Sequence, residues 1–202
     1  MQSTMKNMVV VLFVITLLSA LAVGGVYMLT KDPIAKAKLE AENKARKEVL
    51  PEGIYSLVEQ RDTTLDGATV TVCRMMRDSD GAMFYAVKSS ADGYGGKITV
   101  MVGLDDSLHV QNIKVLEHKE TPGLGANLTL DNEKNLVLKS LKGRAVTEHT
   151  KVKKDGGDVD ALTAATISSR AYLDAVRLAV KAVEKATPQS DNKTEKGVND
   201  GE

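Results

Sequence analysis

Hydrophobic residues at the start of the chain form one unbroken run. From Asn7 to Thr30 there is no Asp, Glu, Lys or Arg, and almost every residue is apolar. At a rise of about 1.5 Å per residue, such a helix crosses the roughly 30 Å hydrocarbon core of a bilayer. A cleaved signal peptide is the alternative, because Ala20-Leu21-Ala22 has the form of a cleavage site. The apolar run continues to Leu29, which favours an uncleaved transmembrane anchor over residues 1–31.

The next segment mixes charged residues with small apolar ones. Asp32 and Pro33 suit a helix start, because aspartate caps the first turn and proline needs no N–H there. Small apolar residues then recur at helical spacing until Pro51 and Gly53. Residues 32–53 are therefore predicted to form an exposed helical stalk, in preference to a partner-binding helix.

From Ile54 to Val115 the pattern changes to short runs rich in Val, Ile, Thr and Tyr, which is typical of strands. The turn Asp105-Asp106-Ser107 indicates a hairpin between the last two runs. The candidate strands are 68–73, 83–87, 97–102 and 110–115.

Two helices are predicted after these strands. One runs from Asn132 to Lys142, with Asp131 as its cap and Gly143 as its end. The other runs from about Ser168 to Ala186 and carries one apolar stripe. The fold class is therefore α+β: a single N-terminal transmembrane helix followed by one mixed α/β domain over residues 54–187. Residues 188–202 hold almost no hydrophobe and are predicted to be a disordered tail.

Composition removes several classes of function. Lys plus Arg equals Asp plus Glu at 27 each, so no basic surplus indicates a nucleic-acid partner. Cys73 is the single cysteine, which excludes an internal disulfide and a cysteine-only metal cluster, and a buried structural thiol is expected. The three histidines lack metal-ligand spacing, so no metal is predicted. No general acid, general base or nucleophile is predicted either.

Three segments are candidates for a binding site. The first, Asp160 to Ser169, places small residues and hydroxyls directly before the last helix, where free N–H groups favour an anion such as phosphate. An ordinary helix cap is the alternative. The second, His118 to Gly125, contains a Pro-Gly-x-Gly turn whose small surface could lie against a planar ring. The third, Asp92 to Gly96, is not a nucleotide-binding loop, because it lacks the Gly-Lys-Ser/Thr ending. Plain turns are the alternative for the last two.

The pattern Asp160-x-x-Thr163-x-Ala165-Thr166 resembles the flavinylation motif of the FMN-binding domain family. This family includes the G component of the Rnf ion-translocating electron-transport complex and the C component of the sodium-pumping NADH:quinone reductase. The resemblance implies that a flavin transferase, using FAD, esterifies FMN to Thr166 and recognises Asp160, Thr163, Ala165 and Thr166. The family usually has Gly where this chain has Ala164, and alanine tolerates positive φ less well.

The segments at 118–125 and 92–96 are similar to two further signatures of the same family. Together the resemblances imply a covalently held, phosphothreonyl FMN whose ring rests against Leu124 and Tyr94. The cofactor-binding residues implied are Tyr94, Glu120, Thr121, Gly123, Leu124, Gly125, Thr163, Ala164, Ala165 and Ile167.

The implied function is an electron relay in a membrane-bound ion-translocating ferredoxin:NAD oxidoreductase complex. Its partners would be the other membrane and peripheral subunits, the flavin transferase and membrane lipid. Lysines and arginines after the span would place the domain in the cytoplasm by a literal charge count. Family membership instead implies a single-pass protein of the cell membrane with an extracytoplasmic domain. The alternatives are the equivalent component of the sodium-pumping quinone reductase and a non-redox anchored binding or scaffold module.

Overall fold

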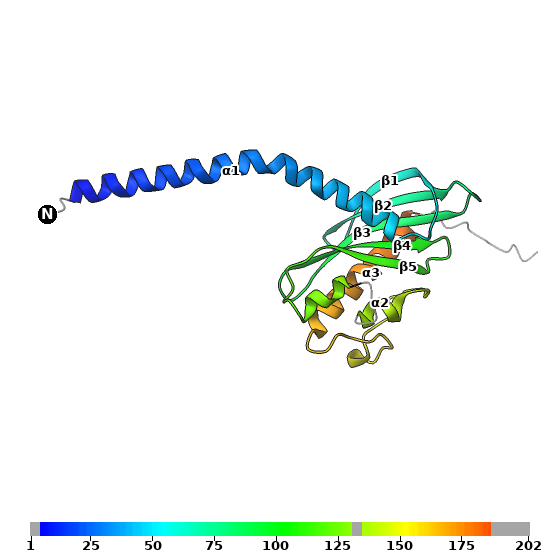
Figure 1. Ribbon diagram of the computed structural model, residues 1–202. Helices are drawn as coiled ribbons and strands as arrows, with labels where there is room; N and C mark the ends of the chain where they lie inside the picture. The colour runs from blue at the N-terminus through cyan, green and yellow to red at the C-terminus, as the bar shows by residue number, and fades with distance from the viewer. Residues whose placement is uncertain (1–4, 131–134, 187–202) are drawn as a thin grey trace, which may run out of the picture. The chain divides into compact units, whose positions relative to one another are not determined.

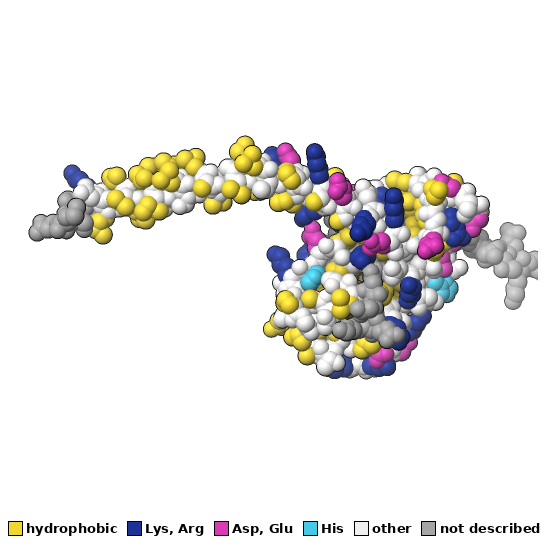
Figure 2. Space-filling model, in the orientation of Figure 1, with side chains coloured by type: hydrophobic (Ala, Val, Ile, Leu, Met, Phe, Trp, Pro, Cys, Tyr) yellow, Lys and Arg dark blue, Asp and Glu magenta, His cyan; other side chains and the backbone are white. Residues whose placement is uncertain are grey.

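The computed structural model describes residues 5–130 and 135–186. Its first element, α1 (Met5–Glu48), is one uninterrupted helix with Pro33 inside it. The helix is long and apolar enough to cross a membrane, and Figure 2 shows hydrophobic side chains along its first part. The predicted helix start at Asp32 and Pro33 is wrong. Proline removes one backbone hydrogen bond, but good helix formers such as Ala35 and Lys36 follow it, and the helix continues.

The chain divides into two compact units, residues 1–44 and 45–202. Described residues of the first unit are almost all exposed, as expected for an anchor and a stalk taken alone. The last turn of α1 belongs to the second unit, because Ala45, Val49 and Leu50 are buried in its core. The prediction of an exposed stalk as far as residue 53 is therefore wrong for these residues.

A five-stranded antiparallel sheet forms the centre of the second unit, with its strands in the order of the chain (Figure 1). The strands are β1 (Tyr55–Leu65), β2 (Ala68–Arg77), β3 (Met83–Asp92), β4 (Lys97–Asp105) and β5 (Val110–Glu117). All four predicted strands are confirmed, and each is longer than predicted. The hairpin between β4 and β5 is also confirmed.

The first strand, β1, was not among the predicted ones. Most of its residues are exposed, and its middle carries polar and charged side chains. As an edge strand it needs only one hydrogen-bonded neighbour, so its sequence lacks the alternating apolar pattern that marks a half-buried strand. It joins β2 through the two-residue turn Asp66-Gly67, in which both residues have positive φ, as tight hairpins require.

Both faces of the sheet are covered. Helix α3 (Thr166–Ala186) packs against β2, β3 and β4 on one face (Figure 1). Its buried stripe includes Tyr172, Val176 and Val183, as the periodicity predicted. The last turn of α1 covers part of the other face, where Val49 and Cys73 are buried. The buried thiol was predicted, although Cys73 lies within β2 and not at its end.

Three short helices complete the unit: η1 (Gly125–Thr129), α2 (Leu136–Leu141) and η2 (Lys153–Asp155). The helix predicted from Asn132 to Lys142 is shorter than expected. Its N-cap is Asn135, whose side chain accepts a hydrogen bond from the N–H of Leu138. The predicted cap Asp131 and the predicted tail 188–202 lie outside the described residues.

Candidate functional site

The three candidate segments meet around one cavity of about 520 Å³. The β3–β4 turn, the segment after β5 and the start of α3 each form part of its wall. These segments converge because β4 pairs with both β3 and β5, while α3 crosses the same end of the sheet. The lining residues are Tyr94, Glu120, Thr121, Leu124, Gly125, Ala164, Ala165, Thr166, Ile167 and Ser168.

Glu120 links all three segments from a buried position. One carboxylate oxygen accepts a hydrogen bond from the N–H of Gly95, at 3.0 Å. The other accepts a hydrogen bond from the hydroxyl of Ser168. A Cβ added at Gly125 would lie 2.6 Å from both Glu120 Oε2 and Ser168 Oγ, so this close approach requires glycine. The carboxylate therefore fixes the cavity's shape from within.

Ser168 was not among the predicted site residues. Its hydroxyl lies two residues after Thr166, in the first turn of α3. Nothing in the sequence marks which hydroxyl of this turn faces Glu120, because the partner is 48 positions away in the chain. The only signal was its place within the hydroxyl-rich segment.

Thr166 is the first residue of α3 and is half-buried at the cavity wall. Its Oγ1 accepts a hydrogen bond from Lys154 Nζ at 2.9 Å. The preceding loop is held to the helix by Ser169, whose hydroxyl accepts from the N–H of Leu162 at 3.0 Å and donates to the carbonyl of Ala165 at 2.9 Å. The position of the Thr166 hydroxyl is thus fixed by a rigid loop.

Ala164 has φ +59°, in the left-handed region that glycine adopts more readily. It lies in the turn immediately before the helix, and its side chain contributes to the cavity wall. The loop geometry thus demands positive φ at the position where the flavinylation pattern usually has glycine.

Two predicted site residues do not line the cavity. Gly123 has φ +77° and follows Pro122 in a turn closed by the hydrogen bond from the N–H of Leu124 to the carbonyl of Thr121. This arrangement is a type II turn, so Gly123 shapes the segment that presents Leu124. Thr163 is exposed in the turn before Ala164.

Ion pairs surround the start of α3 on its outer side. Asp160, the residue implied in transferase recognition, accepts a hydrogen bond from Lys153 Nζ at 2.6 Å. Arg170 donates two hydrogen bonds to Asp155, at 2.8 and 2.6 Å. These bonds hold the pKa of Asp155 below its ordinary value. Both pairs fasten the η2 segment beside the helix start.

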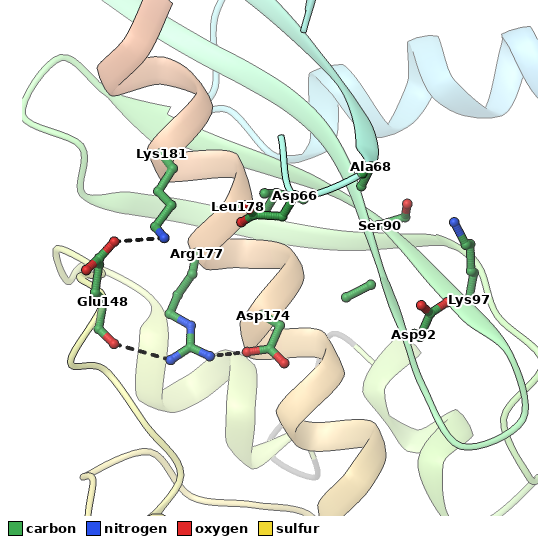
Figure 3. A pocket seen from close by; sticks show the side chains of 12 residues that line it. Asp66, Ala68, Ser90, Asp92, Lys97, Glu148, Asp174, Arg177, Leu178 and Lys181 are labelled. Carbon is green, nitrogen blue, oxygen red and sulfur yellow. Dashed lines mark hydrogen bonds and ion pairs between the residues drawn. The ribbon is translucent and has the colours of Figure 1, made fainter. Parts of the chain in front are cut away.

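A second cavity, of about 480 Å³, lies elsewhere on the unit (Figure 3). Charged side chains dominate its wall, and several of them pair with one another: Lys181 Nζ lies 2.7 Å from a carboxylate oxygen of Glu148, and Arg177 contacts Asp174. None of its described lining residues belongs to the predicted site. Among the described residues that line the cavity at Thr166, only Glu120 carries a charge, so that cavity suits a largely apolar ring better. Within residues 5–130 and 135–186, no three metal-ligating side chains converge.

Comparison with known proteins gives matches over both parts of the chain. The family model of the FMN-binding domain matches residues 93–181, and the model of the RnfG N-terminal region matches residues 1–49. The G component of the ion-translocating oxidoreductase complex of Haemophilus influenzae is 33% identical over 169 residues, covering 79% of this chain and 81% of that protein. The G component of Aliivibrio fischeri is 30% identical over 192 residues, covering 89% and 90%. A crystal structure of the C component of the Na(+)-translocating NADH-quinone reductase from Parabacteroides distasonis aligns with 18% identity and a TM-score of 0.49, over 74% of this chain and 94% of that one.

Proposed function

Because the chain belongs to the G-component family of ion-translocating oxidoreductase complexes, we propose that it is the electron-carrying flavoprotein subunit of such a complex. The residues matched by the FMN-binding domain model, 93–181, include every residue that lines the cavity at Thr166. A bound FMN would supply the redox chemistry, while the chain holds and orients it.

The cavity suits this cofactor in size and composition. Its volume of about 520 Å³ lies within the range of roughly 300–1,000 Å³ common for ligand sites. Small residues at Gly125, Ala164 and Ala165 leave room for a flat ring. Tyr94 and Leu124 provide the apolar contacts implied by the resemblance, and Glu120 supports the wall behind them.

The attachment point is the side-chain oxygen of Thr166. This oxygen lies at the cavity wall and at the first turn of a 21-residue helix, whose free N–H groups stabilise a phosphate. During maturation a bond forms from Thr166 Oγ1 to the phosphorus of the FMN half of FAD. The bond between that phosphorus and the AMP half breaks, AMP leaves with the bonding electrons, and the hydroxyl proton passes to a base of the transferase. The convergence of Thr166 with the Glu120 segment around one cavity is the observation that carries this proposal.

The apolar run of α1 anchors the protein in the membrane as a single span, and the domain lies on the extracytoplasmic side. The membrane and peripheral subunits of the complex are the electron donors and acceptors, with ferredoxin and NAD at the ends of the chain of carriers. Between Asn7 and Thr30 the span has no acidic, basic or histidine side chain, so it provides no ion path of its own. The protein is therefore a relay within the translocating complex.

Production of the full chain together with a flavin transferase tests the attachment. The denatured wild-type band should fluoresce under ultraviolet light, and mass spectrometry should find FMN on the peptide that contains Thr166. Thr166→Val should abolish both signals, whereas Thr69→Val, at an exposed position on β2, should keep them. A wild-type band without flavin would leave a non-redox anchored module. The subunits that purify with the loaded protein would separate a ferredoxin:NAD complex from a sodium-pumping quinone reductase.

A further inference from the structure

Lys154 is the cation nearest to the proposed attachment oxygen. Its Nζ lies 2.9 Å from Thr166 Oγ1 and donates a hydrogen bond to it. Nothing in the sequence distinguishes this lysine from its neighbours, because it precedes the threonine by 12 positions. Only the folded chain brings the two side chains together.

The backbone around Lys154 is held in place. Val152 and Val159 are buried and form a parallel bridge, with the N–H of Val159 bonded to the carbonyl of Lys151 at 3.1 Å. Asp155, the next residue, is fastened to α3 by its two hydrogen bonds from Arg170. Lys154 therefore reaches Thr166 from a segment fixed at both ends.

The charges around Thr166 are balanced except for Lys154. Lys153 pairs with Asp160 at 2.6 Å. Arg170 pairs with Asp155 at 2.6 Å. Among the described residues, Lys154 forms no ion pair, and its partner is the neutral Thr166 hydroxyl. The start of α3 thus carries one uncompensated positive charge beside the oxygen at which a phosphodiester would bring one negative charge.

We propose that Lys154 is the phosphate-binding residue of this site, a role that rests on the attachment of FMN to Thr166. Its ammonium group already reaches the oxygen that becomes the ester oxygen, so a small rotation of its flexible side chain brings it to the charged phosphate oxygens. A hydrogen bond between ionised partners is stronger than the present bond to a neutral hydroxyl. Lys154 accordingly guides the phosphate to Thr166 during loading and neutralises the phosphodiester afterwards.

The rate of loading tests the first part of this role. The unloaded full chain in detergent is incubated with purified flavin transferase and FAD, and the gain in intact mass is followed with time. Lys154→Met should load about tenfold more slowly than wild type, as expected for the loss of one charge-assisted hydrogen bond. Lys154→Arg should recover most of the rate. Lys142→Met, which removes an exposed lysine at the end of α2, should load like wild type.

The melting temperature tests the second part. Wild type and Lys154→Met are each compared before and after complete loading. The increase in Tm on loading should be smaller in Lys154→Met by about 2–4 °C, while the unloaded forms melt alike. Equal increases, or loading of Lys154→Met within twofold of wild type, would overturn the role of Lys154. If wild type itself gained no FMN at Thr166, the proposed function would fail instead, and the two failures are distinct.

Discussion

Replacing Ala164 with glycine should stabilise the protein, because the native backbone holds this alanine at φ +59°. An L-residue in the left-handed region is disfavoured by about 1–2 kcal/mol, since its Cβ crowds the following carbonyl. Glycine removes that cost but loses about 0.5–1 kcal/mol more conformational entropy on folding. The balance is a net gain of about 0.5–1 kcal/mol in the free energy of unfolding. Little packing is lost, because Ala164 is exposed.

Thermal unfolding of the unloaded full chain in detergent, followed by circular dichroism, measures this gain. For a chain of this size the expected increase in Tm is about 2 °C. Ala161→Gly is the matched control, three residues earlier in the same loop, at a residue whose φ is not positive. It should lower the Tm, because there glycine contributes only its entropy cost and loses a methyl group packed against the core. An Ala164→Gly protein that melts at or below the wild-type temperature would refute the strain argument.

Two further predictions concern Glu120 and Asp80. Glu120→Ala should destabilise the protein by about 2–3 kcal/mol, because it leaves the Gly95 N–H and the Ser168 hydroxyl without their acceptor; urea unfolding measures this, and Glu120→Gln, which keeps an amide oxygen, should cost less. Hydrogen bonds from Arg77 lower the pKa of Asp80 from 3.8 to about 2. Its folded pKa lies below the unfolded one, so its contribution to stability is present above about pH 4 and is lost as the pH falls towards 2. The urea midpoint should therefore fall less steeply over this window in Asp80→Asn than in wild type.

The sequence predicted the strands best where burial on both faces dictates it. The run 97–102 falls in β4, which is covered by α3 on one face and by the end of α1 on the other, so almost every residue is apolar. The edge strand β1 was missed for the opposite reason, since solvent accepts polar side chains on both of its faces. The helix start at Pro33 was predicted from local chemistry alone, and the surrounding helix formers override that preference.

The candidate site divides in the same way. Residues within recognisable segments, such as Leu124 and Thr166, line the one cavity to which the resemblance assigned them. Ser168 and Lys154 were not predicted, because their importance depends on partners reached only through the tertiary fold. The positive φ of Ala164 was anticipated by the glycine of the family pattern, which is a backbone requirement that a motif can record.

The shape of the cavity gives a physical reason for a covalent link. Its rim is open: Tyr94, Leu124 and Ile167 keep 72%, 41% and 50% of their surface exposed. Retention of a small ligand by contacts alone usually requires burial of about 70–90% of its surface, which an open rim does not provide. An ester to Thr166 removes this requirement, because the attached flavin cannot diffuse away however much of its ring faces solvent. The same exposed apolar rim can then meet an electron-transfer partner, so the tether allows a site to be open for exchange of electrons without losing the cofactor.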